Sequence, residues 1–228
     1  MKNKSAFTMI ELVFVIIVLG ILASLAMGRM ERDLKQEASE TILSHIRLAQ
    51  QLALSDNKHL DNSITTDRNK WQDSYWRFEF SNCEFDGDVK PIYAVGSGKL
   101  DNGDLSKERS AINPVNGKYL FGSCTASSNA SDVSEDVFAG QHFGIKNMKL
   151  TRCYKDSDTT PRGGHFGFDY LGRLHVAVGS YDNIGTDYFD EIATRDCNLT
   201  VTMSDETTFS IIIENETGHS YIEGQDNS

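Results

Sequence analysis

The sequence predicts an α+β protein in which a long N-terminal α-helical spine packs on a C-terminal antiparallel β-sheet domain. Three observations carry this prediction. Residues 6–23 form an apolar run with a single carboxylate, and residues 34–53 repeat apolar side chains at helical spacing. Beyond residue 70, apolar and polar residues alternate as they do in strands. We expect one half of the spine to lie in a membrane and the other half in a protein core.

The apolar run is long enough for one membrane span. Phe7 to Met27 comprises 21 residues, about 31 Å of helix. The eleven Leu, Ile, Val and Phe residues from 12 to 25 contribute about −5 kcal/mol to insertion, against about +3 kcal/mol for one charge at the helix centre. Glu11 lies near the end of the run and costs less than a central charge. Insertion is therefore favoured.

The charges before the run predict the orientation of the chain. Lys2 and Lys4 precede the span, and basic residues remain on the cytoplasmic side of a membrane. We therefore expect a single-pass protein of the bacterial inner membrane with its C-terminal domain in the periplasm.

The membrane span is predicted to continue into an amphipathic helix. Its exposed side is charged, and Gly28 could loosen the helix between the two halves. We expect the helix to end near residues 56–57. The apolar positions of its predicted buried face are Leu34, Ala38, Ile42, Ile46, Ala49 and Leu52 or Ala53.

In the remaining chain, apolar and polar residues alternate, as they do in the strands of an antiparallel sheet. Turn signals at 170–173, 204–207 and 215–218 predict consecutive hairpins. Residues 81–117 and 122–140 are expected to be loops. The predicted strands are 75–80, 143–150, 166–170, 173–178, 199–203 and 208–213.

Four cysteines follow the span, on the side where disulfides persist. Four cysteines allow three pairings. We favour Cys83 with Cys124 and Cys153 with Cys197, each closing a loop of about 40 residues worth roughly 3 to 4 kcal/mol. Buried free thiols are the alternative. Zinc is disfavoured because no C-x-x-C spacing occurs.

The start of the chain carries a specific motif. Ala6, Phe7, Thr8 and Glu11 precede an unbroken aliphatic stretch, and this order resembles the class III signal sequence of type IV pilins and type II secretion pseudopilins. The resemblance implies that a prepilin peptidase cuts between Ala6 and Phe7 and N-methylates Phe7. Ala6 replaces the usual glycine, and Gly28 replaces a proline that many relatives carry.

Glu11 is the residue that the resemblance assigns to assembly. In assembled relatives, the carboxylate at this position faces the N-terminal amine of a neighbouring subunit, here the amine of Phe7. A buried carboxylate without a partner is strongly unfavourable, so this pairing selects one register between subunits. The alternative is a plain signal anchor in which Glu11 reaches the membrane interface.

These expectations divide the chain into five segments. They are a leader at 1–6, a membrane and assembly helix at 7–28, an amphipathic helix at 29–58, a periplasmic β domain at 59–222 and a disordered acidic tail at 223–228.

A second resemblance narrows the predicted function. Residues 46–51, then 166–169 with 172–174, and a hairpin at 217–218 resemble the H-type minor pseudopilins and related minor type IV pilins. This implies a structural subunit of a type II secretion pseudopilus or type IV pilus that supports protein secretion. The implied partners are other pilin or pseudopilin subunits, prepilin peptidase, the inner-membrane assembly platform and lipid.

Catalysis is not expected. No nucleophile elbow, metal-binding helix or phosphate loop occurs in the sequence. We therefore predict that the chain is not an enzyme. The side chains that could in principle act as bases or nucleophiles are His142, His165 and His175, with Ser180, Asp169 or Asp182 nearby.

We expect no cofactor and no metal. The acidic stretches 101–104, 156–158 and 182–187 offer oxygen ligands that calcium prefers, but none fits the EF-hand pattern, so solvated turns are favoured over a calcium site.

Nucleic acid is an unfavoured partner because the net charge is −11. The alternative is a competence-type minor pilin that binds DNA during uptake. A gel-shift titration at low salt discriminates the two.

Overall fold

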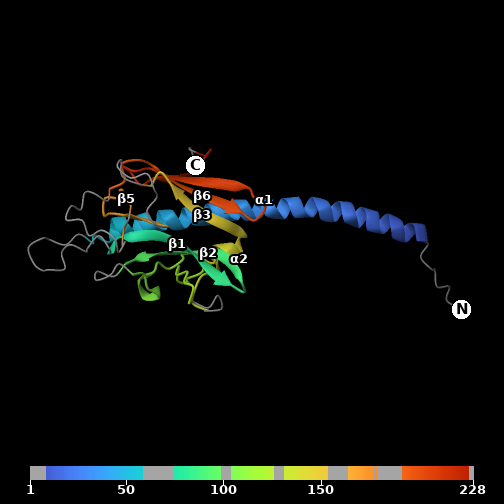
Figure 1. The fold of residues 1–228 in the computed structure, drawn as a ribbon, viewed down its shortest axis with the longest axis horizontal. Helices are drawn as coiled ribbons and strands as arrows, with labels where there is room; N and C mark the ends of the chain where they lie inside the picture. Colours follow the sequence, from blue (N-terminus) through green and yellow to red (C-terminus); the bar gives the residue numbers. More distant parts are fainter. Residues whose placement is uncertain are drawn as a thin grey trace, which may run out of the picture.

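The computed structural model describes residues 9–58, 74–98, 104–125, 131–153, 164–176, 178 and 192–225, with the backbone but not the side chains of 23–33. One long helix, α1 (Met9–Ser55), precedes two antiparallel sheets (Figure 1). The predicted α+β class is confirmed. The leader, Ala6 and Phe7 lie outside the described residues.

Helix α1 is a continuous rod of 47 residues, about 70 Å long. Its backbone remains helical through Gly28, where the sequence allowed a looser helix. In Figure 1, the N-terminal half projects away from the strands along the long axis of the molecule, and the C-terminal half runs among them. The helix ends one residue before the predicted boundary at 56–57.

The strands form two four-stranded sheets, where the sequence predicted one sheet. The first sheet has the order β2 (Asp88–Ser97), β1 (Trp76–Phe85), β4 (His165–Phe168) and β5 (Leu174–Val176). The second has the order β3 (Ile145–Thr151), β6 (Cys197–Met203), β7 (Thr208–Ile213) and β8 (Ser220–Ile222). Short helices η2 (Lys107–Arg109), η3 (Glu135–Val137) and α2 (Ala139–His142) lie between β2 and β3.

The prediction of a loop over residues 81–117 is wrong for its first half. β1 continues to Phe85, and β2 pairs with it residue by residue from Phe85↔Asp88 to Trp76↔Ser97. Asp86 and Gly87 turn the chain with φ values of 53° and 86°, the left-handed conformations that a two-residue hairpin requires. This Asp-Gly pair is the sequence signal that the prediction missed.

The amphipathic half of α1 fills the space between the sheets, because it contacts strands of both. Five positions of the predicted face are fully buried, and Leu34 and Leu52 are half-buried. Opposite them, Phe78 of β1 stacks on Phe166 of β4 with ring centroids 5.6 Å apart. The buried face of α1 consists of Ala38, Ile42, Ile46, Ala49 and Ala53, as predicted, with Ser39, Leu43 and His45 in addition.

Two disulfides join segments outside the strands to strands of the two sheets. Cys83 of β1 is joined to Cys124, with Cα atoms 5.2 Å apart, and Cys153 after β3 is joined to Cys197 of β6, with Cα atoms 4.5 Å apart. These are the two pairs that the sequence favoured. Each closes a loop of more than 40 residues, which restricts the unfolded chain.

Candidate assembly site on the projecting helix

The projecting half of α1 is apolar around its whole circumference. Twelve large apolar side chains between Met9 and Leu22 expose 37–85% of their surface in the single chain. A helix that is apolar on all sides belongs in lipid or in contact with other protein. Covering these half-exposed side chains is worth on the order of 10 kcal/mol.

Glu11 is the acidic residue in the first turn of this helix, and it lies on the exposed surface. Phe7, its predicted partner from a neighbouring copy, lies outside the described residues. The geometry therefore places the carboxylate where a second molecule can reach it.

By length and hydropathy, no helix within the described residues qualifies as a membrane span.

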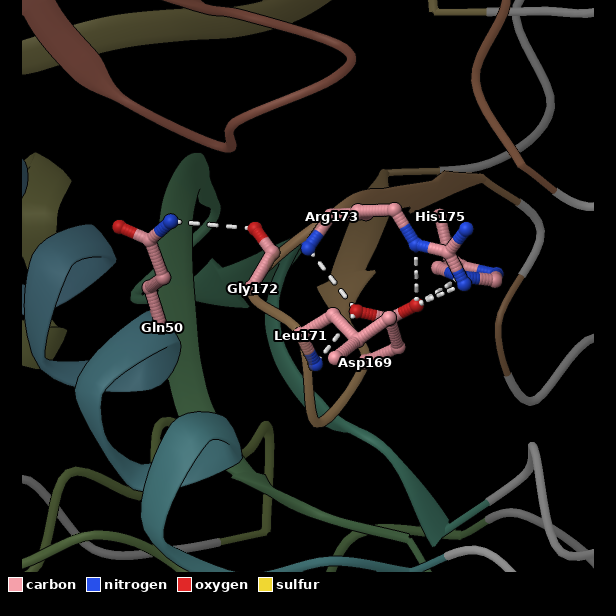
Figure 2. A network of polar contacts seen from close by, with 6 residues as sticks. All are labelled: Gln50, Asp169, Leu171, Gly172, Arg173 and His175. Carbon is pink, nitrogen blue, oxygen red and sulfur yellow. Dashed lines mark hydrogen bonds and ion pairs between the residues drawn. The ribbon is translucent and has the colours of Figure 1, made fainter.

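The other end of α1 is tied to both sheets by polar side chains. Gln50 Nε2 donates to the backbone oxygen of Gly172 at 3.1 Å and to that of Thr217 at 2.7 Å. Arg47 donates from Nε and Nη2 to the backbone oxygen of Ser220 at 3.1 and 2.8 Å. We call Arg47 and Gln50 the helix clamp, because they join α1 to the β4–β5 turn and to the β7–β8 hairpin. Figure 2 shows the contact between Gln50 and Gly172.

Two glycines let these turns approach the helix. Gly172 and Gly218 have φ values of 80° and 64°, a region that side chains with a Cβ rarely adopt. A Cβ on Gly218 would overlap the backbone oxygen of Gly172 and lie 2.6 Å from Gln50 Nε2. Gly172 and Gly218, which belong to the predicted 172–174 and 217–218 elements, therefore allow the two sheets to pack closely against α1.

Asp169 stiffens the β4–β5 turn from inside. Its Oδ1 accepts hydrogen bonds from the backbone N–H groups of Leu171 and Arg173, both at 2.9 Å, and its Oδ2 contacts the Arg173 side chain at 2.8 Å and His175 Nε2 at 3.3 Å (Figure 2). Burial alone would raise the pKa of Asp169, but these hydrogen bonds and the nearby positive charge lower it to about 2. The turn that receives Gln50 is thus held by an ionised carboxylate.

The three histidines considered as bases lie on three different elements. His142 ends α2, 3.6 Å from Asp136. His165 begins β4, where burial lowers its pKa against the opposing charge of Glu79. His175 lies in β5 and contacts Asp169.

Of the candidate partners of these histidines, Asp169 contacts His175. Ser180 and Asp182 lie outside the described residues, and so do 101–103, 156–158 and 182–187 of the acidic stretches. Asp104 is described and exposed. Within the part of the chain that the structure describes, no three His, Cys, Asp or Glu side chains gather as metal ligands.

His45 is a buried polar residue that the sequence reasoning missed. It lies on α1 with its Nδ1 2.8 Å from the Tyr93 hydroxyl of β2. Burial lowers the pKa of His45 to about 4, although the charge of Asp136 acts in the opposite direction. The sequence offered one indication that His45 is buried: it lies between Leu43 and Ile46, which belong to the buried face of the helix.

Comparison with protein families matches residues 1–27 to the prokaryotic N-terminal methylation motif. Comparison with curated proteins gives no match, and comparison with solved structures gives none. The motif supports a type IV pilin-like or pseudopilin-like protein, anchored in a membrane, processed by prepilin peptidase and assembled with other pilin subunits. It points to a structural subunit.

Proposed function

We propose that this chain is a minor pseudopilin or minor pilin, most like the H-type subunits, that assembles into a periplasmic filament supporting protein secretion. The observation that carries the proposal is the combination of an N-terminal methylation motif with a helix that leaves the folded domain and exposes only apolar surface and Glu11 over residues 9–22.

The proposed mechanism is mechanical assembly. The apolar half of α1 waits in lipid, and an assembly motor at the inner-membrane platform transfers it to the helices of other subunits. Helix packing then replaces lipid, and the carboxylate of Glu11 meets the N-terminal amine of Phe7 in a neighbouring copy.

The clamp supports this mechanism because force on α1 must reach the domain. Arg47 and Gln50 connect the helix to the second sheet through Thr217 and Ser220, and Gln50 connects it to the first sheet through Gly172. A pull along α1 is thereby shared between both sheets. Resemblance in the 166–174 region supports the H-type assignment.

Mass spectrometry of the purified membrane form tests the proposal. In cells with active prepilin peptidase, we expect a chain that lacks Met1 to Ala6 and starts with N-methylated Phe7. A chain that retains Met1 in such cells would overturn the proposed function. Cells without the peptidase provide the matched control, in which the leader should persist.

A further inference from the structure

We propose that a pocket on the second sheet binds a small zwitterion, an amino acid that carries its carboxylate and its ammonium group at the two ends of an aliphatic chain. The pocket has a volume of about 340 Å³, which is enough for a ligand of this size. Its described lining residues come from the second sheet and the segments beside its strands rather than from α1. The inference therefore goes beyond the proposed function.

The floor of the pocket is a row of neighbours across three strands. Asn198 of β6 pairs with Ile212 of β7, and Ile212 pairs with Tyr221 of β8. All three line the pocket and are half-buried. The Tyr221 ring stacks on His219, with ring centroids 5.7 Å apart, which fixes its orientation. Ile212 and Tyr221 thus provide an apolar surface for the methylene groups of a ligand.

Opposite charges enter the pocket from the two edge strands of the sheet. Arg152 follows β3 and Glu223 follows β8, and both line the pocket. The order β3-β6-β7-β8 separates these edge strands by about 14 Å, at about 4.8 Å per neighbouring pair. Across the described part of the chain, neither side chain has an ion-pair partner. A ligand with both charges can satisfy both residues at once.

The position of Arg152 is fixed by the backbone beside it. Arg152 has a φ of 62°, a left-handed conformation that is uncommon for a residue with a Cβ. The next residue, Cys153, is joined by a disulfide to Cys197, which also lines the pocket. The guanidinium is therefore presented from a tethered segment, and its planar fork suits a ligand carboxylate.

Two further polar side chains of the pocket are held by neighbours. Asp196 Oδ1 accepts a hydrogen bond from the backbone N–H of Asn215 at 3.0 Å, and Asn198 Oδ1 accepts one from Thr200 Oγ1 at 3.3 Å. The amide Nδ2 of Asn198 can donate to the ligand carboxylate. Because Asp196 is already engaged with the backbone, Glu223 is the carboxylate that receives the ligand's ammonium group.

The mixed charge of the pocket disfavours other classes of ligand. A ligand with a single charge leaves either Arg152 or Glu223 without a partner, and a neutral glycan leaves both. A polyanion such as nucleic acid is repelled by the net charge of −11.

Isothermal titration calorimetry of the full chain in detergent tests the inference. The probes are ω-amino acids from glycine to 6-aminohexanoate, in which the distance between the two charges increases by one methylene at a time. Hexanoate and hexylammonium carry one charge each, and chitotetraose represents neutral glycans. We expect one length of ω-amino acid to bind about tenfold more tightly than either single-charge probe.

Arg152→Gln and Glu223→Gln should each weaken binding of the best ω-amino acid by about tenfold, because each removes one charged contact. Lys149→Gln and Glu84→Gln are the matched controls, since both residues are exposed and neither lines the pocket. These controls should leave the affinity unchanged. All four changes are at exposed positions, so an unchanged Tm in a thermal scan verifies that the variants fold.

The absence of binding, equal binding of the single-charge probes, or an affinity that survives Arg152→Gln or Glu223→Gln would overturn the inference. Tighter binding of chitotetraose would overturn it in favour of a glycan site. None of these results bears on the proposed function, which is tested separately by the cleavage and methylation of the N-terminus.

Discussion

The contact between the β7–β8 hairpin and the helix clamp predicts a large effect for Gly218→Ala. At φ 64°, an alanine costs about 1–2 kcal/mol of backbone strain. Its Cβ would also overlap the Gly172 backbone oxygen and crowd Gln50 Nε2, so the hairpin must move away from α1. Losing the two Gln50 hydrogen bonds removes about 1 kcal/mol each. The expected loss is about 3 kcal/mol.

Urea unfolding of the full chain in detergent measures this loss, and a thermal scan should show a Tm lower by about 6–12 °C. Gly117→Ala is the matched control, because Gly117 has a φ of 71° and nothing within 4 Å of its Cβ position. The control should lose only the backbone strain of about 1–2 kcal/mol. Gln50→Ala combined with Gly218→Ala should be less destabilising than the sum of the single changes. Equal losses for the two glycine variants would refute the reasoning.

Three further predictions concern charged or titratable groups. Glu11→Ala should abolish filament entry while cleavage continues, as measured by electron microscopy and mass spectrometry; normal filaments would contradict the charge-pair account. Because the pKa of His45 is lowered to about 4 from 6.5, the unfolded chain binds the proton first, so unfolding free energy should fall by about 3 kcal/mol from pH 6.5 to pH 4. His45→Gln should flatten this dependence in urea titrations across that range, and an unchanged slope would count against it. Asp169→Asn should lower the free energy of unfolding by about 2–3 kcal/mol at pH 7, because a neutral amide replaces a carboxylate that accepts hydrogen bonds from a charged side chain. The difference in unfolding free energy between the variant and the unchanged chain should shrink as the pH falls from 3.8 through 2, where Asp169 becomes protonated. A difference that stays constant over this range would argue against an ionised Asp169.

Much of the architecture was predictable because its signals are local. Helical spacing from Leu34 to Ala53 identified the buried face of α1, and alternation identified six of the strands. β2 was missed because its residues from Pro91 to Ser97 are all buried and therefore do not alternate, although the turn at Asp86–Gly87 marked the hairpin.

The sequence by itself determined that an apolar, motif-bearing helix starts the chain and continues into an amphipathic one, since hydrophobic spacing and length act within a single segment. Only the tertiary structure decided that the strands divide into two sheets around α1, and that Gln50 meets Gly172 and Thr217 more than 100 residues away. The same holds for the burial of His45 against Tyr93. These contacts depend on which segments pack together, and no local pattern of residues encodes that choice.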